Sequence, residues 1–505
     1  MSGPLACSVA DERMTVADPT PVGPGETAAR RPQARRWSLL GDRLGWSWLS
    51  LGLAGSILIT VSAPRLTGGG WWFEVNLPAG RPANVAAVYL GIAAMSCAWL
   101  GVGARLTRSP SIRLAELWAA GAIWCVPLLL APPLFSRDIY SYLAQGAIFH
   151  LGHNPYHVGP VILARLGQQH LLNAVSPFWR STTAPYGPTF IAIMSWVVGL
   201  SGSHLVAAAT LARLVELAGV ALLAVFIPRL ARRLGADPLR ATWIAVISPL
   251  VLLELIGAGH NDALMAGLMV AGLALALERR PVLGIALCAA AATIKLPAAA
   301  AAVLIAVAWA RSEPTAAMRA RVLAQATLVA VAVIGGVGLV TGLGLGWLST
   351  SLFSTPAKVH LAITPTTTVG WTIGPLLGVR SRTIARALSI PAAAVTAALG
   401  AWIIWRVRFE NLVRYLGVLL LVAALSGPAA WPWYFLWGLV LVAACPMFQR
   451  SRVIPVAVVL AVFVVKPGGT FLLPVRAAPF VLVVYIILAG VAWQRAARRA
   501  AASRA

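Results

Sequence analysis

Long apolar runs alternate with short polar segments along nearly the whole chain. An α-helix needs roughly 18–20 apolar residues to cross a bilayer, and runs near this length recur along the chain, with some shorter ones among them. They fall near residues 46–63, 84–104, 114–134, 204–227, 241–257, 261–277, 282–294, 296–310, 322–341, 384–405, 411–427, 431–447, 452–465 and 478–494. The pattern therefore predicts an all-α polytopic membrane protein, a helix bundle with about 13–14 transmembrane helices.

Arginines in the short loops between these runs predict the topology. Loops on the cytoplasmic side of a membrane protein carry an excess of Lys and Arg, and most of the arginine pairs here fall on one side. Residues 1–45 are then a disordered cytoplasmic tail, residues 46–494 a single transmembrane domain, and residues 495–505 a basic cytoplasmic tail. Two large loops, 135–187 and 342–383, are predicted to lie outside.

Two segments do not fit this topology simply. Residues 188–227 are too long for one span, so we expect a short, partly inserted helix at 188–201 packed against 204–227. The arginines at 380, 382 and 386 would lie outside, against the general trend. A short extra span near 367–379 would remove that exception, but it would reverse the direction of every later helix.

Composition excludes a soluble protein and accounts for the charge. Hydrophobic residues make up 59% of the chain and charged residues 11%, with a mean hydropathy of +0.82, so a soluble fold would have a largely apolar surface. The formal net charge of +25 would suggest nucleic acid on a soluble protein. Because the arginines lie in loops beside apolar runs, topology explains them, and we expect the lipid bilayer but no nucleic acid as a partner.

Several polar side chains fall on the predicted outer side of the bundle. They are the turn from Gly259 to Asp262 and all three lysines of the chain, Lys295, Lys358 and Lys466. An ionisable group at membrane depth costs about 3 kcal/mol or more, so each is a candidate for function. For Lys358 and Lys466, snorkelling of a lysine at a helix end is an equal alternative. Asp262 has the alternative role of capping the helix that follows it.

The segment from Phe135 to Pro160 is the most distinctive part of the outer loops. Ser136 is expected to cap an amphipathic helix that lies in the membrane interface. Asp138 falls in the first turn of that helix, where the helix dipole favours a carboxylate, and this structural role is one interpretation. The other is functional, because an ionisable group at or near membrane depth is a candidate for function.

Three histidines follow in the same loop. His150, His153 and His157 have a spacing that could hold a metal on a helix. Pro155 breaks that helix before His157, however, and no cysteine or second acidic residue is close in sequence. We therefore expect a solvated histidine cluster and no cofactor, with a divalent metal as the alternative.

The same segment resembles a known family. Phe135–Tyr142 with Gly146, then Asn154–Tyr156 and Gly159-Pro160, then Tyr186–Pro188, are similar to motifs of the C-type glycosyltransferases of the actinobacterial cell envelope. Among these the chain looks most like the polyprenol-phosphomannose-dependent alpha-(1→6)-mannopyranosyltransferases of the A/B type. The segments 260–265 and 295–297 look like that family too, and the resemblance covers roughly residues 40–495. The motifs are fairly specific in combination, and none is specific alone.

The resemblance implies an inverting glycosyltransferase whose active site lies outside the cytoplasm. It would move mannose from polyprenyl-phosphate mannose to a lipid-anchored mannan in alpha-1,6 linkage, in lipomannan synthesis. Asp138 matches the family's catalytic carboxylate and would be the general base. The leaving lipid phosphate needs cationic or hydrogen-bonding stabilisation, and the candidates are Lys295, Arg137 and Lys466. Substrate contacts are expected from Tyr140, Tyr142, Tyr186, His260, Asn261, Asp262, Trp371 and Trp431.

Alternatives stay open at this point. The same spans, hairpins and lysines suit a transporter or flippase of lipid-linked sugars, although transporters tend to show repeat symmetry and ionisable groups near the midplane. A C-type transferase for another lipid-phosphate sugar is also open, because no motif distinguishes mannose from arabinose or glucose. For Trp431, a place in the interfacial aromatic belt is an equal alternative to stacking on a sugar.

Overall fold

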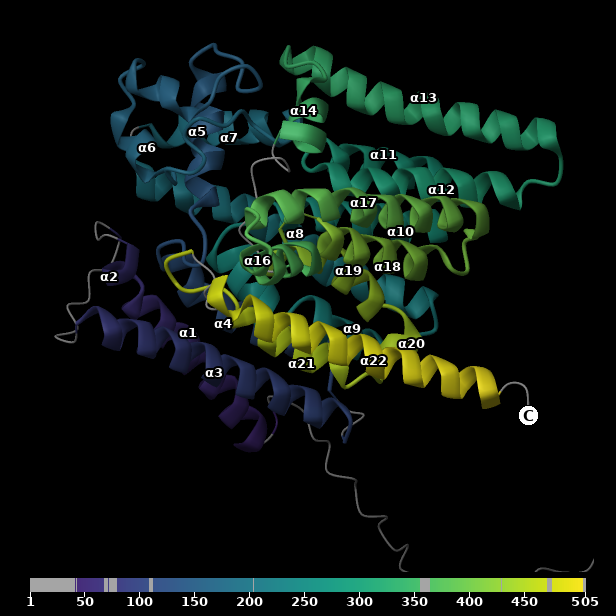
Figure 1. Cartoon of the computed structure of the whole chain (residues 1–505), viewed down its shortest axis with the longest axis horizontal. Coiled ribbons are helices and arrows are strands. Elements are labelled where there is room, and N and C mark those ends of the chain that lie inside the picture. The colour runs from purple at the N-terminus through teal and green to yellow at the C-terminus, as the bar shows by residue number, and fades with distance from the viewer. Residues whose placement is uncertain are drawn as a thin grey trace, which may run out of the picture. The chain divides into compact units, whose positions relative to one another are not determined.

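The computed structural model describes residues 41, 43–67, 71, 80–108, 112–202, 204–354, 364–427, 429–469 and 475–502. Within these residues every regular element is a helix and no β-strand occurs, which confirms the all-α prediction (Figure 1). Most of the predicted tail at 1–45 lies outside the described residues, and so does Lys358 in the loop 342–383.

The first part of the chain alternates long and short helices. Its elements are α1 (Arg43–Ser62), α2 (Pro64–Thr67), α3 (Arg81–Leu106), α4 (Leu114–Leu130), α5 (Asp138–His150), η1 (Pro160–Ala164), α6 (Gln169–Ala174), α7 (Pro188–Ser201), α8 (Leu205–Arg233), α9 (Pro238–Ala245), η2 (Val251–Gly257), α10 (Asp262–Leu277), α11 (Pro281–Ala292), η3 (Leu296–Ala298) and α12 (Ala299–Ser312). The short helix predicted at 188–201 is present as α7, and it packs against α8.

The second part has the same character. Its elements are α13 (Ala316–Thr341), α14 (Gly346–Ser349), η4 (Thr350–Ser354), α16 (Pro365–Leu376), α17 (Ser381–Arg406), α18 (Leu412–Ser426), α19 (Pro432–Ala443), α20 (Pro446–Gln449), α21 (Val453–Val462), η5 (Val475–Ala477) and α22 (Ala478–Ala502). The extra helix considered near 367–379 is present as α16, a helix of 12 residues that packs against α17 and α22.

Helix length divides the apolar helices into two groups. In the described residues, α1, α3, α8, α13 and α17 are each long and apolar enough to cross a membrane. The pair of η2 and α10, bent by 115°, would make a sixth, broken span, and the other apolar helices have 10–17 residues. The prediction of about 13–14 spans therefore overestimates the number of helices of full membrane length, because proline and glycine interrupt several apolar runs.

The run 241–257 shows how such an interruption arises. The apolar pattern predicts one span, but α9 ends at Ala245 and the chain becomes helical again only at Pro249, directly before the π-helix η2. Pro249 lies between them, and proline has no N–H to donate and clashes with a continuing helix. The turn after η2 contains Gly259 with a φ of 75°, a left-handed conformation that suits glycine. This turn leads directly into His260 and the start of α10.

Helix α5 is buried within the bundle. Most of its side chains are buried, and it packs against α7 and α8. A Cβ added at Gly146 would lie 2.5 Å from a backbone carbon of Met194 in α7, so this close approach requires glycine. The prediction of an amphipathic helix lying in the membrane interface is therefore wrong for α5, because neighbouring helices cover the face that was expected to meet the interface.

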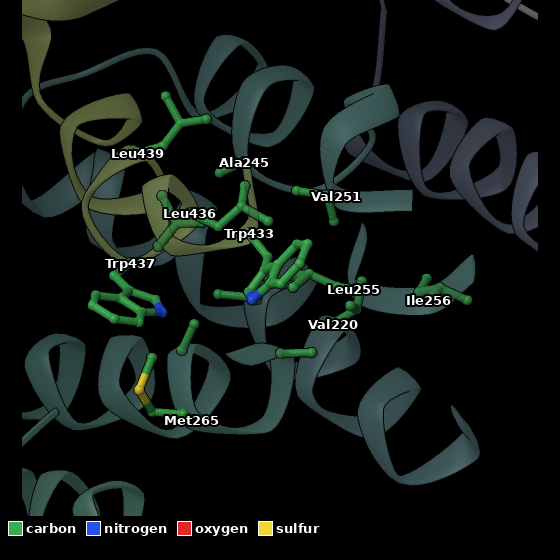
Figure 2. Close-up of a cluster of buried hydrophobic side chains, with 14 of the residues drawn as sticks. Val220, Ala245, Val251, Leu255, Ile256, Met265, Trp433, Leu436, Trp437 and Leu439 are labelled. Atoms are coloured by element: carbon green, nitrogen blue, oxygen red, sulfur yellow. The ribbon is translucent and has the colours of Figure 1, made fainter. Parts of the chain in front are cut away.

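Helix α19 ties the centre of the bundle together. It contacts α9, α10 and η2, and Figure 2 shows Trp433 and Trp437 projecting among buried side chains that include Leu255 and Met265. In α13 and α17, by contrast, only 17% and 6% of the most apolar stretch is buried. The exposed apolar faces of these two helices are suited to contact with lipid.

Candidate functional site

A cavity of about 960 Å³ opens beside the N-terminal end of α5. Part of its wall is polar and aromatic, and five predicted site residues from four separate segments meet there: Arg137, Asp138, Tyr186, Lys295 and Trp431. Another part of the wall is apolar and comes from α12, α17 and α18. The cavity therefore joins polar groups to a surface that continues between apolar helices.

Asp138 is the first residue of α5 and the only carboxylate among the described residues that line the cavity. Its N–H donates to Ser136 Oγ at 3.0 Å, but the N-cap of α5 is Arg137, one residue later than the predicted cap at Ser136. The preceding Phe135 has a φ of 66°, a conformation that costs a non-glycine residue about 1–3 kcal/mol. Its N–H donates to the Pro467 oxygen at 3.0 Å, which anchors this backbone to the segment before η5.

The surroundings of Asp138 make its carboxylate more basic than usual. Burial raises the pKa of Asp138 to about 6, although the Lys295 ammonium and hydrogen bonds from Ser136 and Trp179 act in the opposite direction. The side chain keeps 19% of its surface exposed. A general base works best when its pKa lies near the working pH, so this carboxylate suits proton abstraction.

Lys295 and Asp262 form an ion pair behind the cavity wall. Lys295 Nζ lies 2.8 Å from both carboxylate oxygens of Asp262, and the indole N–H of Trp437 donates to Asp262 Oδ1. The ammonium also lies 4.9 Å from the ring centroid of Tyr434 and 5.5 Å from that of Trp437, within cation–π range. The Asp262 carboxylate is thus held by Lys295 and Trp437, and it makes no capping hydrogen bond to α10.

His260 lies directly behind Asp138. Its Nε2 is 3.9 Å from Asp138 Oδ2, and its Nδ1 is 2.7 Å from the backbone oxygen of Glu254. The imidazole stacks on Trp433 with 3.7 Å between ring centroids, and Trp433 stacks on Trp431 at 4.9 Å. The two tryptophans line the cavity, so the stack connects the buried histidine to the cavity surface.

Other predicted substrate contacts do not reach the cavity. The side chains of His260, Asn261 and Asp262 are fully buried, so the direct contact that we expected does not match this geometry. The reason is that the turn before α10 packs beneath α19. Tyr142 is also buried, and its ring meets that of Tyr186 edge-on at 4.9 Å. The cavity lining does not include Tyr140, Trp371 or Lys466.

Arg137 differs from Lys295 in its partners. Arg137 Nη2 donates to the backbone oxygen of Asn173 at 3.1 Å, and Arg180 Nη2 donates to the same oxygen at 3.2 Å. Among the described residues neither guanidinium forms an ion pair with a carboxylate. Because Asp262 already balances the charge of Lys295, Arg137 moves ahead of Lys295 as the candidate for binding a phosphate.

Several cavity residues escaped the sequence reasoning. Ser141 and Gln145 follow Asp138 at i+3 and i+7, so helical periodicity alone would have placed them on the same face of α5. Tyr434 and Trp437 belong to an apolar run that reads as an ordinary buried helix. Only their packing against Lys295 marks them.

The histidine cluster gives no support for a metal. In the parts of the chain that the structure describes, no group of three or more His, Cys, Asp or Glu side chains is placed to hold a metal ion. His150 is the last residue of α5, and His153 and His157 follow in the turns beyond it.

A helical membrane bundle whose cavity combines a basic carboxylate, cationic groups and stacked aromatic rings has the features of a membrane-embedded glycosyltransferase. Two family models match the chain. The one described as "Alpha-(1->6)-mannopyranosyltransferase, N-terminal domain" matches residues 48–311, and the one described as "MptB C-terminal domain" matches residues 363–502. The chain belongs to the alpha-(1→6)-mannopyranosyltransferase family and is therefore a mannosyltransferase, which confirms the family resemblance of its motifs.

Curated relatives lead to the same family. The chain is 38% identical over 399 residues to alpha-(1→6)-mannopyranosyltransferase A of Mycobacterium tuberculosis, covering 76% of this chain and 75% of that relative. It is 34% identical over 437 residues to a probable alpha-(1→6)-mannopyranosyltransferase of Mycolicibacterium smegmatis, covering 78% and 76%. A second Mycobacterium tuberculosis alpha-(1→6)-mannopyranosyltransferase is 30% identical over 457 residues, covering 78% and 76%. No solved structure matches the chain.

Proposed function

We propose that this mannosyltransferase takes mannose from polyprenyl-phosphate mannose and transfers it, with inversion, to a lipid-anchored mannan on the extracytoplasmic face. The observation that carries the proposal is one cavity in which Asp138 shares walls with Arg137 and Lys295 and with an apolar surface from α12, α17 and α18. A lipid-phosphate sugar has the matching parts: a reacting carbon, an anion and an apolar chain.

Asp138 acts as the general base in this proposal. The acceptor oxygen attacks the anomeric carbon, and its proton passes to the Asp138 carboxylate. The bond between that carbon and the phosphate oxygen breaks, and its electron pair leaves with the phosphate. This single displacement inverts the anomeric centre and needs one base, whereas retention through a covalent intermediate needs a second group as nucleophile. The lone carboxylate among the described lining residues supports the former.

The leaving phosphate requires positive charge or hydrogen-bond donors. Arg137 supplies a guanidinium that adjoins the base in sequence and lines the same cavity. Guanidinium groups bind phosphate oxygens with two parallel hydrogen bonds, which a single ammonium does not provide. The charge of the Lys295 ammonium lowers the pKa of Asp138, and the position of Lys295 is fixed by Asp262.

The apolar wall offers room for the prenyl chain of the donor. Small residues form this wall: Ala393, Ala397 and Gly400 from α17, and Ala423 and Ala424 from α18. A Cβ added at Gly400 would meet only a Leu419 methyl group, at 3.9 Å, so this part of the groove is open. Since α17 is mostly exposed on its apolar faces, a chain in the groove would continue into lipid.

The arginines support an extracytoplasmic cavity. Arg105, Arg232, Arg311 and Arg406 lie in the last turns of α3, α8, α12 and α17. The polar wall comes instead from the starts of α5 and η3 and from the loop that leads into α19. Positive charge collects on the cytoplasmic side of membrane proteins, so the polar wall faces the other side.

The test is transfer by purified protein in membranes supplied with radiolabelled polyprenyl-phosphate mannose and a soluble mannoside. Labelled mannoside with one more mannose is the expected product, and its anomeric configuration reports inversion. Movement of the labelled lipid across the membrane without a new glycosidic bond would instead establish a flippase and contradict the proposal. A cysteine placed at Ser176, in the cavity wall, should react with a membrane-impermeant maleimide in intact cells.

A further inference from the structure

Two polar side chains in the cavity wall are left without partners by the protein itself. Ser141 is 3% exposed and Gln145 is 2% exposed. Among the described residues, neither Ser141 Oγ nor Gln145 Oε1 has a hydrogen-bond partner. Both residues line the cavity that contains Asp138.

Some comparable buried residues elsewhere in this fold are satisfied, although others outside the cavity, such as Ser96, also have no partner among the described residues. The buried Gln449 donates to the Asp237 and Ala443 oxygens and accepts from the Asp237 N–H at 2.9 Å. The buried Ser201 donates to the Val197 oxygen at 2.8 Å. A buried amide or hydroxyl without a partner is costly, so an unpaired set facing a cavity points to a ligand that supplies the missing partners.

Helix geometry places both groups close to the reacting atoms. Asp138, Ser141 and Gln145 lie on one face of α5, and a rise of 1.5 Å per residue puts Ser141 about 4.5 Å and Gln145 about 10.5 Å along the axis from Asp138. Side chains on a helix lean toward its N-terminus, so the long Gln145 side chain extends back toward Ser141. Tyr186 lines the same cavity and its ring contacts that of Tyr142, the neighbour of Ser141.

We propose that Ser141 and Gln145 form a subsite that binds the hydroxyl groups of a mannosyl ring whose reacting atom lies at Asp138. The ligand class follows from the donor and acceptor types: a hydroxyl donates and accepts, an amide oxygen accepts, and an adjacent aromatic ring covers an apolar sugar face. The ring belongs either to the donor or to the acceptor, which present the same chemistry. This inference rests on the proposed function, because it takes mannose as the transferred group.

The experiment measures kcat/KM with two series of substrate analogues. In the first series the prenyl-phosphate donor carries a deoxymannose, and in the second the acceptor is a deoxymannoside. The acceptor hydroxyl that reacts is kept in every analogue. Gln145→Met is expected to lower kcat/KM with the natural substrates about tenfold or more, because the sugar hydroxyl loses its partner. With the one analogue that lacks that hydroxyl, Gln145→Met and the wild type should agree within about twofold, since no bond remains to be lost. Coupling to a donor hydroxyl assigns the subsite to the donor, and coupling to an acceptor hydroxyl assigns it to the acceptor.

Two further variants keep the result interpretable. Ser141→Ala removes only one oxygen and should show the same coupling even if Gln145→Met impairs folding. Ser96→Ala is the matched control, because Ser96 in α3 is equally buried and without a partner among the described residues, yet it lies outside the cavity. Ser96→Ala should leave kcat/KM unchanged for every analogue.

The possible outcomes distinguish a failure of the proposed subsite from a failure of the proposed function. If the Gln145 and Ser141 variants lose the same factor in kcat/KM with every donor and acceptor, or lose nothing, the subsite is contradicted, even though the wild type still transfers mannose. A wild-type enzyme that transfers no mannose from prenyl-phosphate mannose overturns the proposed function instead.

Discussion

Asp138 and Asp262 each begin a helix, α5 and α10, yet the fold gives these two carboxylates opposite surroundings. Asp262 is fully buried and is held by the Lys295 ammonium and the Trp437 indole. Asp138 borders a cavity and keeps 19% of its side chain exposed. Among the described residues its only basic neighbour within ion-pair distance is His260, at 3.9 Å, and the Lys295 ammonium acts on it from farther away. The carboxylate that is paired with a cation is suited to structure, and the one without a cation in direct contact is available for chemistry.

The difference teaches that position in a helix does not decide what a carboxylate does. The helix dipole favours both residues in the same way. What separates them is that a cation from another segment neutralises Asp262, whereas burial without a cation in contact raises the pKa of Asp138. Removing the charge of either carboxylate tests this explanation.

The largest effect is expected from Asp138→Asn. Removing a general base lowers kcat about 10²–10⁴-fold, because no group then takes the proton of the attacking sugar hydroxyl in the transition state. The thermal stability of the protein should be unchanged, since Asn keeps the shape and the helix-start preference. Near-normal turnover in a transfer assay would contradict the role of base. Asp237→Asn, which keeps an N-cap far from the cavity lining, is the matched control.

Asp262→Asn should act on stability instead. Removing one partner of a buried ion pair costs about 3–5 kcal/mol, because the Lys295 ammonium is left without its counter-charge. The midpoint of thermal unfolding in detergent should fall, and adding Lys295→Met in the same chain should recover part of the loss. If Asp262→Asn melts like the wild type, the ion pair is not structural and the contrast with Asp138 fails.

Filling the groove should separate lipid binding from chemistry. Gly400→Phe is expected to reduce kcat/KM for a long-chain polyprenyl donor about tenfold or more, while a short-chain prenyl donor is used normally, because the added ring occupies the open space beside Leu419. Gly335→Phe in α13, where an added Cβ also meets nothing within 4 Å, is the control. Equal losses for both donors would argue against the groove.

The pH dependence tests the ionisation of Asp138. A base must be deprotonated, and burial raises the pKa of Asp138 to about 6. The value of kcat/KM should therefore be flat above about pH 7 and fall roughly tenfold per unit below pH 6. A profile that stays flat down to pH 4 would show that a carboxylate with an ordinary pKa, or a different group, controls the rate.

The smallest effect is expected at the aromatic stack. Trp431→Ala should raise KM about fivefold, because a sugar loses one stacking face worth about 1 kcal/mol, and Trp431→Phe should restore most of it. Substrate titrations in the transfer assay measure both variants. Unchanged KM in Trp431→Ala would favour the interfacial aromatic belt as the role of Trp431.

Much of this protein could be derived from its sequence by local reasoning. A bilayer forces backbone groups to pair within helices, so apolar runs located the ends of α1, α3, α8, α13 and α17 to within six residues. Asp138 and Lys295 stood out because charged groups are rare in such a chain. Family motifs then identified a mannosyltransferase, because short signatures need no knowledge of packing.

Tertiary structure alone decided which polar groups share a surface. The sequence placed Asp262 and His260 on the same side as Asp138, and only the packing of α19 over the turn before α10 buried them behind the wall. The packing of α5 against α7 and α8 likewise buried Ser141 and Gln145, which are left without partners for their side-chain oxygens among the described residues. The physical reason is that burial and hydrogen-bond satisfaction depend on residues distant in the chain, whereas hydropathy and helix formation depend on neighbours.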